Sequence, residues 1–166
     1  IRARTAVTVV SKQNNVNNIS LSLLHLTIDS IISSGLPLAY SYSDTIIRIT
    51  PVAPLNINDS ITLTVYYHGQ PQQDPSWGGF YFSGTYAFNL GVTFNEDPHS
   101  FGRVWFPCID EFTDRSTYSF HITTPATYKA FCNGFLVDST VNANGTRTWN
   151  WQMNQTIPSY LACVAV

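Results

Sequence analysis

Hydrophobic and polar residues alternate along most of this chain, in short stretches separated by turn-forming residues. The clearest stretch places Ile61, Leu63, Val65 and Tyr67 at every second position, with polar residues between most of them. A period of two is typical of a half-buried β-strand, because successive side chains of a strand point to opposite faces. Similar, in places weaker, patterns predict further strands over residues 2–10, 38–42, 47–49, 116–124 and 149–153.

The stretch from Ile19 to Ile32 changes phase by one residue, between Leu23 and Leu24. A one-residue slip within a strand indicates a β-bulge, so we expect one bulged strand here. A helix is the competing interpretation. The many β-branched, Ser and Thr residues of this stretch disfavour it.

The predicted strands recur every ten residues or so, with Gly, Pro, Asn and Asp between them and no convincing helix. This spacing predicts an all-β fold, an antiparallel β-sandwich or barrel. A chain of 166 residues is long enough to bury a substantial core. We therefore expect a single domain over residues 1–166.

Charge is unusually scarce, since charged residues make up 11% of the chain and the net charge is −2. Asn, Ser, Thr and Tyr supply most of the polarity, and only two residues are lysines. Without a basic patch, nucleic acids and anionic membranes are poor candidate partners. No apolar run approaches the roughly 20 residues of a membrane span. This composition predicts an extracytoplasmic location, and the start at Ile1 predicts a segment of a longer protein or one that has lost a leader.

The three cysteines, Cys108, Cys132 and Cys163, have no CxxC spacing and are expected to be buried thiols. One disulfide with a free thiol is the alternative, and the sequence does not select the pair. The four histidines are scattered and form no HExxH motif. We therefore expect no metal site built by this chain alone.

A charged corner follows an aromatic segment near residue 105. Asp110 and Glu111 lie beside many aromatic residues, and Arg103 and Arg115 are the available counter-charges. A buried charge needs a partner, so we expect these arginines to brace the corner. The two adjacent carboxylates would point to opposite faces of a strand, which disfavours joint acid–base chemistry.

A second segment rich in aromatic residues and glycine comprises residues 77–82 and 86–94 and includes the aromatic stretch from Trp77 to Tyr86. It is interpreted first as part of a strand pair that packs on a neighbouring sheet. The alternative is a groove for a ligand. In that case the chain would be a non-enzymatic β-sandwich that binds a polymer or a protein partner through these aromatic side chains.

Residues 103–111, RVWFPCIDE, resemble the R-x-x-F-P-C-x-D-E-P segment of the aminopeptidase N-like zinc metallopeptidases, the gluzincin family. The similarity continues through residues 115–118, and residues 157–162, IPSYLA, resemble the family's M-S-T-Y-L-x-A segment. Residues 19–28 and 65–69 also fit the family pattern. The structural motif residues are Arg103, Phe106, Pro107, Cys108, Asp110, Glu111, Arg115 and Tyr160.

The resemblance implies the amino-terminal, saddle-like β-sandwich domain of such an enzyme. Zinc, HExxH and the general base would belong to a catalytic domain after Val166, so this chain alone would not be catalytic. The implied function is to shape the substrate cleft and support that domain. Its partners would be its own downstream catalytic domain and a peptide substrate. Phe112 replaces the family's proline, which indicates a divergent branch.

The resemblance also implies a substrate-binding position. In the family, a Gln or Glu some ten residues before F-P-C helps to hold the free amine of the substrate. This position falls near Thr93, with Glu96 nearby. Because threonine has a short hydroxyl in place of a carboxylate or amide, we expect weaker discrimination against substrates without a free amine.

Overall fold

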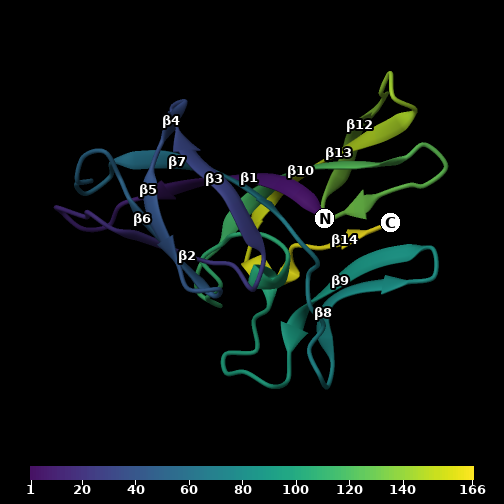
Figure 1. Ribbon diagram of the computed structural model, residues 1–166, viewed down its shortest axis with the longest axis horizontal. Coiled ribbons are helices and arrows are strands. Elements are labelled where there is room, and N and C mark those ends of the chain that lie inside the picture. The colour runs from purple at the N-terminus through teal and green to yellow at the C-terminus, as the bar shows by residue number, and fades with distance from the viewer. The chain divides into compact units, whose positions relative to one another are not determined.

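The computed structural model describes residues 1–166, which form β-strands and two short 3₁₀-helices but no α-helix (Figure 1). All strand pairs are antiparallel, as the alternating pattern predicts for an all-β fold. The chain divides into two compact units. Unit 1 contains Ile1–Gln72 and Arg103–Ile109, and unit 2 contains Gln73–Gly102 and Asp110–Val166. The expectation of a single domain stays a prediction.

Unit 1 consists of two antiparallel sheets with strand orders β1-β7-β3-β4 and β2-β6-β5. Its longest pairing joins β1 to β7 over nine residues, which confirms the two strands predicted from alternation. Leu63, Val65 and Tyr67 of β7 are fully buried. The strands are β1 (Arg2–Val10), β2 (Ile19–Ser22), β3 (Thr27–Ser33), β4 (Leu36–Pro37), β5 (Ala39–Tyr42), β6 (Ile46–Thr50) and β7 (Ser60–His68).

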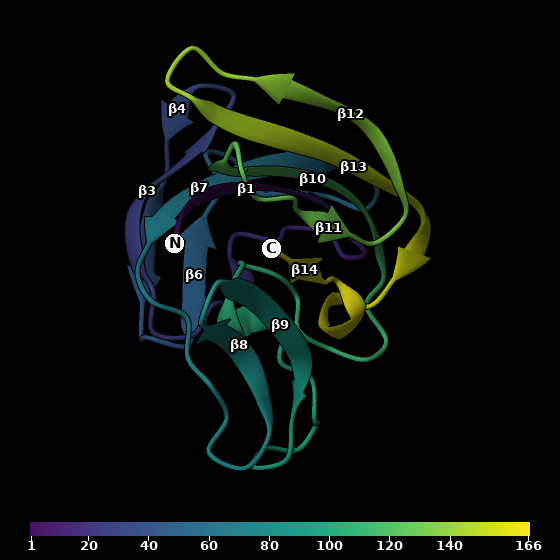
Figure 2. The ribbon, with the colours of Figure 1, turned by 90° about the vertical axis from the view of Figure 1, so that its right-hand side faces the viewer.

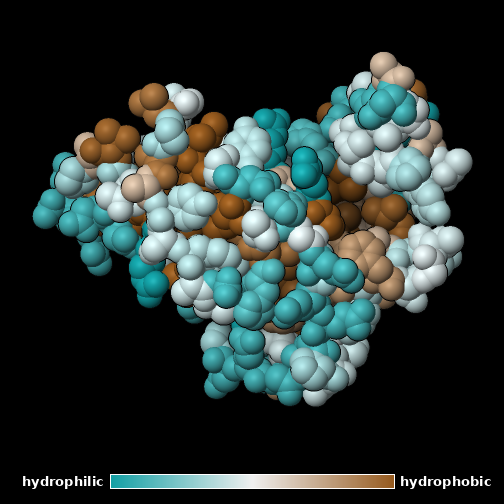
Figure 3. Space-filling view, in the orientation of Figure 1, coloured by the Kyte–Doolittle hydropathy of each residue, from teal (hydrophilic) through white to brown (hydrophobic).

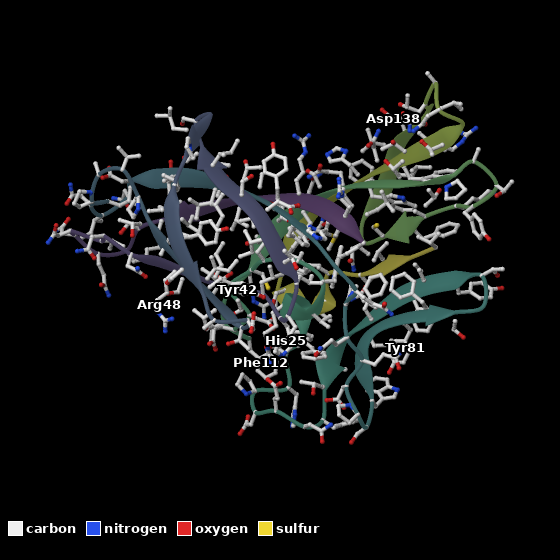
Figure 4. All side chains as sticks on the ribbon, viewed as in Figure 1. His25, Tyr42, Arg48, Tyr81, Phe112 and Asp138 are labelled. Carbon is white, nitrogen blue, oxygen red and sulfur yellow. The ribbon has the colours of Figure 1, made fainter.

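The prediction of one bulged strand between residues 19 and 32 is wrong. The segment forms β2 and β3, which belong to different sheets. Leu23 and Leu24 are buried between them, and His25 turns the chain with a positive φ of 49°. The Tyr42 hydroxyl donates to the Leu23 carbonyl oxygen over 3.1 Å and ties this turn to β5 (Figure 4). Consecutive buried leucines therefore mark a crossing between sheets.

Residues Arg103–Ile109, which contain the F-P-C motif, belong to unit 1 together with Ile1–Gln72. Val104 and Phe106 are buried, within a segment that contains the 3₁₀-helix η1 (Gly102–Val104). Cys108 and Ser22 exchange both backbone hydrogen bonds, at 2.7 and 3.1 Å, so this segment extends the edge of β2. The Tyr67 hydroxyl donates to the Trp105 carbonyl oxygen over 3.0 Å.

Unit 2 also contains two antiparallel sheets, with strand orders β10-β13-β12 and β11-β14-β9-β8 (Figure 2). The long strand β13 lies between β10 and β12. The elements are β8 (Gly78–Ser83), β9 (Tyr86–Thr93), β10 (Ser116–Pro125), β11 (Phe131–Cys132), β12 (Phe135–Val141), β13 (Thr146–Ile157), η2 (Ser159–Leu161) and β14 (Val164–Ala165).

Strand β10 has a more buried face and an exposed face, as its alternating sequence predicts. Phe120 is buried and Tyr118 and Ile122 are half-buried, whereas the alternating residues Ser119, His121 and Thr123 are exposed. On the exposed face, Ser119 pairs with Gln152 and His121 with Asn150, at 2.6 and 2.7 Å. The Asn150 amide in turn donates a hydrogen bond to the carboxylate of Asp138 on β12, which is labelled in Figure 4. Hydroxyl and amide groups thus replace ion pairs on this face.

The strands after Pro125 differ widely in length, from two residues in β11 and in β14 to twelve in β13. A turn at Asn133-Gly134 separates β11 from β12. A Cβ atom on Gly134, which has a φ of +89°, would lie 2.0 Å from the Gln152 carbonyl oxygen. The apolar C-terminal segment is covered by its own unit, because β14 pairs with both β9 and β11.

Hydrophobic side chains also reach the surface between polar ones, as the brown and teal atoms of Figure 3 show. In unit 1, Leu36 on β4 is 60% exposed. In unit 2, exposed apolar side chains occur on β12 and at the β8–β9 turn. They include Phe135, Leu136, Val137, Phe82 and Tyr86.

Candidate functional site

The carboxylate of Asp110 connects two of the sequence motifs. Asp110 is buried in unit 2 and accepts a hydrogen bond of 2.5 Å from the Ser159 hydroxyl and one of 3.1 Å from the Gly102 backbone N–H. The Ser100 hydroxyl donates to its backbone carbonyl oxygen over 2.6 Å. The F-P-C-x-D-E and P-S-Y-L segments therefore meet at one charged group, which holds the start of η2.

Glu111 and Arg115 do not take part in this arrangement. Both side chains are exposed, and neither forms an ion pair. The prediction that Arg115 braces the corner by charge pairing is therefore wrong, whereas the same expectation for Arg103 stays a prediction. Phe112, which replaces the family's proline, packs edge-on against Tyr160 with ring centroids 5.2 Å apart.

Strand β9 and helix η2 approach each other at backbone distance. A Cβ atom on Gly91 would lie 1.9 Å from the Tyr160 carbonyl oxygen. The amide of Asn89 donates to the Ala162 carbonyl oxygen over 3.0 Å and accepts from the Val164 N–H over 2.7 Å. Glycine at position 91 is required because any side chain would separate these two elements.

Thr93 lies at the end of β9 and is only 1% exposed. Its hydroxyl donates to the carboxylate of Asp74, which is also buried. Asp74 additionally accepts from the Ser76 and Trp77 N–H groups, both at 2.8 Å, and from the Asn95 amide at 2.7 Å. Thr93 thus positions the loop before β8, and Asp74 is the residue at the centre of this network.

Sequence reasoning did not single out Asp74. The available signal is the sequence Asp74-Pro75-Ser76, because an aspartate two residues before a backbone donor favours an Asx-turn. Its connection to Thr93 and Asn95 is invisible in the sequence, since these residues are 19 and 21 positions away.

We expect protonation of the Asp74 carboxylate to lower the stability of the protein at acid pH. Burial acts to raise the pKa of its carboxyl, but hydrogen bonds from Thr93, Trp77, Asn95 and Ser76 outweigh burial and leave the pKa well below its usual range. A lowered folded-state pKa gives stability that is present above about pH 4 and lost as the pH falls through the folded value. We expect the melting temperature of the native chain to exceed that of Asp74→Asn at neutral pH, and the difference to shrink on acidification. A difference independent of pH in thermal scans would contradict this role.

Next to this network, three aromatic side chains form a surface cluster, here called the aromatic rim: Trp77, Phe94 and His99. Trp77 and Phe94 are 46% and 64% exposed, and their ring centroids lie 5.5 Å apart. The His99 ring meets Phe94 edge-on at 6.3 Å. Glu96 is exposed on the same loop. Asp74 accepts hydrogen bonds from the Trp77 N–H and from Thr93 and Asn95, the two neighbours of Phe94. These bonds fix the backbone that carries the Trp77 and Phe94 rings.

The strand pair β8–β9 carries further aromatic contacts. Tyr81, labelled in Figure 4, stacks on Phe88 with ring centroids 5.2 Å apart, and its hydroxyl accepts from the Gly78 N–H over 3.0 Å. The segment from Trp77 to Tyr86 is therefore half of a β-hairpin, as the first interpretation expected.

The cysteines differ in exposure. Cys108 is buried as expected, but Cys132 is half-buried and Cys163 is exposed. All three are free thiols in the structure. The expectation of three buried thiols is therefore confirmed for Cys108 and wrong for Cys132 and Cys163.

No group of three His, Cys, Asp or Glu side chains is placed to hold a metal ion. The residues present therefore do not fit a zinc site, and no catalytic step is assigned to a metal on this chain. The structure also contains no helix that is long and apolar enough to cross a bilayer.

Comparison with known proteins identifies the family. The model of the Peptidase M1 N-terminal domain matches residues 1–161. A comparison with curated protein sequences finds no match. Among solved structures, an M1 zinc metallopeptidase from Deinococcus radiodurans bound to a Tyr-Ser-Ala substrate aligns with a TM-score of 0.85 and 23% identity, over 98% of this chain and 37% of that one.

A second solved structure, aminopeptidase A of Legionella pneumophila in complex with aspartic acid, aligns with a TM-score of 0.79 and 20% identity. The alignment covers 99% of this chain and 19% of that one. Both comparisons show a shared fold. This chain spans well under half of the length of either protein.

Proposed function

Because this chain belongs to the Peptidase M1 N-terminal domain family, we propose that it serves as the amino-terminal part of a zinc-dependent peptidase. In this role it shapes the substrate cleft and supports a catalytic domain that carries the zinc. The chain alone is not catalytic. Its partners are that domain and a peptide substrate.

The observation that carries the proposal is the meeting of the two family motifs at Asp110. The hydroxyl of Ser159 and the N–H of Gly102 converge on one buried carboxylate, which fixes η2 beside β9. The motifs therefore have a structural task that does not require a catalytic group on this chain. This arrangement suits a scaffold that presents loops to another domain.

The aromatic rim is the surface that best suits contact with a peptide. Exposed tryptophan and phenylalanine rings supply large apolar contact areas at low entropic cost. The Asp74 network fixes the rim through the Trp77 N–H and through Thr93. Glu96 offers an exposed carboxylate on the same loop. Because Thr93 is buried, we propose that it acts through Asp74 and that Glu96 is the candidate for binding an amine.

The proposal is tested in the full-length protein by comparing Trp77→Ala with Tyr86→Ala. Both remove an exposed aromatic ring, but Tyr86 lies at the opposite end of the β8–β9 hairpin. We expect Trp77→Ala to lower kcat/KM for peptide substrates about 5–50-fold, mainly through KM, with unchanged zinc content. Tyr86→Ala should stay within about twofold of the native protein. Equal effects of the two changes would refute a role of the aromatic rim in substrate binding. Chelator-sensitive hydrolysis by residues 1–166 alone would refute the proposal that catalysis belongs to another domain.

The second candidate function is a non-enzymatic interaction module. The observation in its favour is the exposure of Phe82 and Tyr86, at 50% and 68%, on either side of the β8–β9 turn. If this second function is correct, Tyr86→Ala should lose partner binding. The native full-length protein should then show no peptide hydrolysis.

We also propose an extracytoplasmic location. The support is compositional: two lysines in 166 residues, and a surface whose polarity comes from hydroxyl and amide groups.

A further inference from the structure

Two cysteines far apart in the sequence lie on neighbouring segments of unit 2. Cys132 ends β11, and its partner across the strand pair is Val164, the residue directly after Cys163. Directly opposed Cα atoms lie about 4.5–5.5 Å apart, and one step along a strand adds about 3.3 Å at right angles. The Cα atoms of Cys132 and Cys163 are therefore expected about 5.5–6.5 Å apart, within the range that a disulfide spans.

The strand pair ends at this point, which frees Cys163 from the regular pleat. Beyond Cys132, the next hydrogen bond is made by a side chain, since the Cys163 N–H donates to Asn133 Oδ1 over 2.6 Å. Cys163 lies between η2 and β14 and belongs to neither. Its side chain is thus not forced to the face opposite Cys132, as strict alternation would require.

The two thiols are near enough to interact electrostatically. Burial raises the pKa of Cys132 to about 12, and the charge of the Cys163 thiolate adds to this rise. Burial also raises the pKa of Cys163, against hydrogen bonds from Asn133. The third cysteine, Cys108, is buried in unit 1 at the edge of β2.

We propose that Cys132 and Cys163 form a disulfide under oxidising conditions, which links the C-terminal strand β14 and the P-S-Y-L segment to β11. This inference does not depend on the proposed peptidase role. The sequence left the pair open, and the strand register now selects it. The cross-link would hold the segment that carries Ser159, the partner of Asp110.

The oxidant is a small-molecule disulfide such as oxidised glutathione. The exposed Cys163 thiol loses its proton to solvent, and the resulting thiolate attacks one glutathione sulfur. The S–S bond of the glutathione disulfide breaks, and the other glutathione leaves as a thiolate that takes up a proton from solvent. The Cys132 thiolate then attacks the Cys163 sulfur of the mixed disulfide and releases the second glutathione in the same way. Two cysteine thiols are oxidised, and one glutathione disulfide is reduced to two thiols.

Tryptic mapping can assign the cross-link without ambiguity. Cleavage after Arg103, Arg115, Lys129 and Arg147 places Cys108, Cys132 and Cys163 on three different peptides. The full-length protein is incubated with oxidised glutathione at about pH 9.5, above the ordinary pKa of a thiol, because burial raises the pKa of both cysteines. It is then alkylated, digested without reductant and measured by mass spectrometry.

We expect residues 130–147 to be joined to the peptide that begins at Thr148 in most molecules, and reduction to separate them. The link should be absent in Cys132→Ser and in Cys163→Ser but retained in the matched control Cys108→Ser. Full alkylation of both thiols after oxidation would overturn the proposal. Glutathione on Cys163 without a link, or a link from either cysteine to Cys108, would also overturn it.

Discussion

Replacing Asp110 by Ala is expected to lower the free energy of unfolding by about 3–5 kcal/mol. The change removes the acceptor of the Ser159 hydroxyl and of the Gly102 N–H, both inside unit 2. Each hydrogen bond to a charged group contributes about 1.5–3 kcal/mol, and its donor would remain buried and unpaired. Urea denaturation, followed by tryptophan fluorescence, measures the loss.

Two further variants identify the origin of this effect. Glu111→Ala changes the adjacent exposed carboxylate and should stay within about 0.5 kcal/mol of the native protein. Ser159→Ala removes one donor, so its effect should be non-additive with that of Asp110→Ala, with a coupling of at least about 1 kcal/mol. Full additivity would mean that the two motifs are not joined through this hydrogen bond.

Replacing Gly91 by Ala is expected to destabilise the chain by about 3 kcal/mol or more. The added Cβ atom would lie 1.9 Å from the carbonyl oxygen of Tyr160 and 2.7 Å from its carbonyl carbon. Both are backbone atoms, so β9 and η2 must move apart, and overpacking of this kind is among the more costly core changes. The measurement is the midpoint and slope of urea unfolding.

Gly84→Ala is the matched control for this substitution. Gly84 lies at the β8–β9 turn with a φ of +60° and has no atom within 4 Å of an added Cβ. Its replacement carries only the backbone penalty of the left-handed region, about 1–2 kcal/mol. If Gly91→Ala costs no more than Gly84→Ala, the close approach of β9 to η2 is not a tight constraint.

The alternating pattern correctly predicted the strands that pair along their whole length within one sheet. Strand β7 has Leu63, Val65 and Tyr67 on its buried face, and β1 pairs with it without a shift. The pattern failed between Leu23 and Leu24, because both residues are buried where the chain passes from one sheet to the other. Periodicity records which side of a strand is buried, and it carries no information about a residue that lies between sheets.

The candidate site was accessible to sequence reasoning only in part. The resemblance identified Asp110 as a motif residue, and local charge matching proposed Arg103 and Arg115 as counter-charges, of which Arg115 is exposed and forms no ion pair. A role of Thr93 at a substrate stays a prediction, and in the structure its buried hydroxyl donates to Asp74. The Ser159 hydroxyl that binds Asp110 and the Asp74 carboxylate that binds Thr93 lie at distant sequence positions, which local patterns cannot identify.

The sequence by itself determined the all-β class, through the period of two and the regular spacing of turns, and it determined the family, through two motifs in order. Tertiary structure alone decided that Asp110 binds Ser159, 49 residues away, and that Cys132 pairs with Val164, the residue after Cys163. The physical reason is that strand pairing brings distant residues together through backbone hydrogen bonds, which are common to all residue types. Local patterns therefore specify strands and faces, whereas the choice of neighbours depends on the whole core.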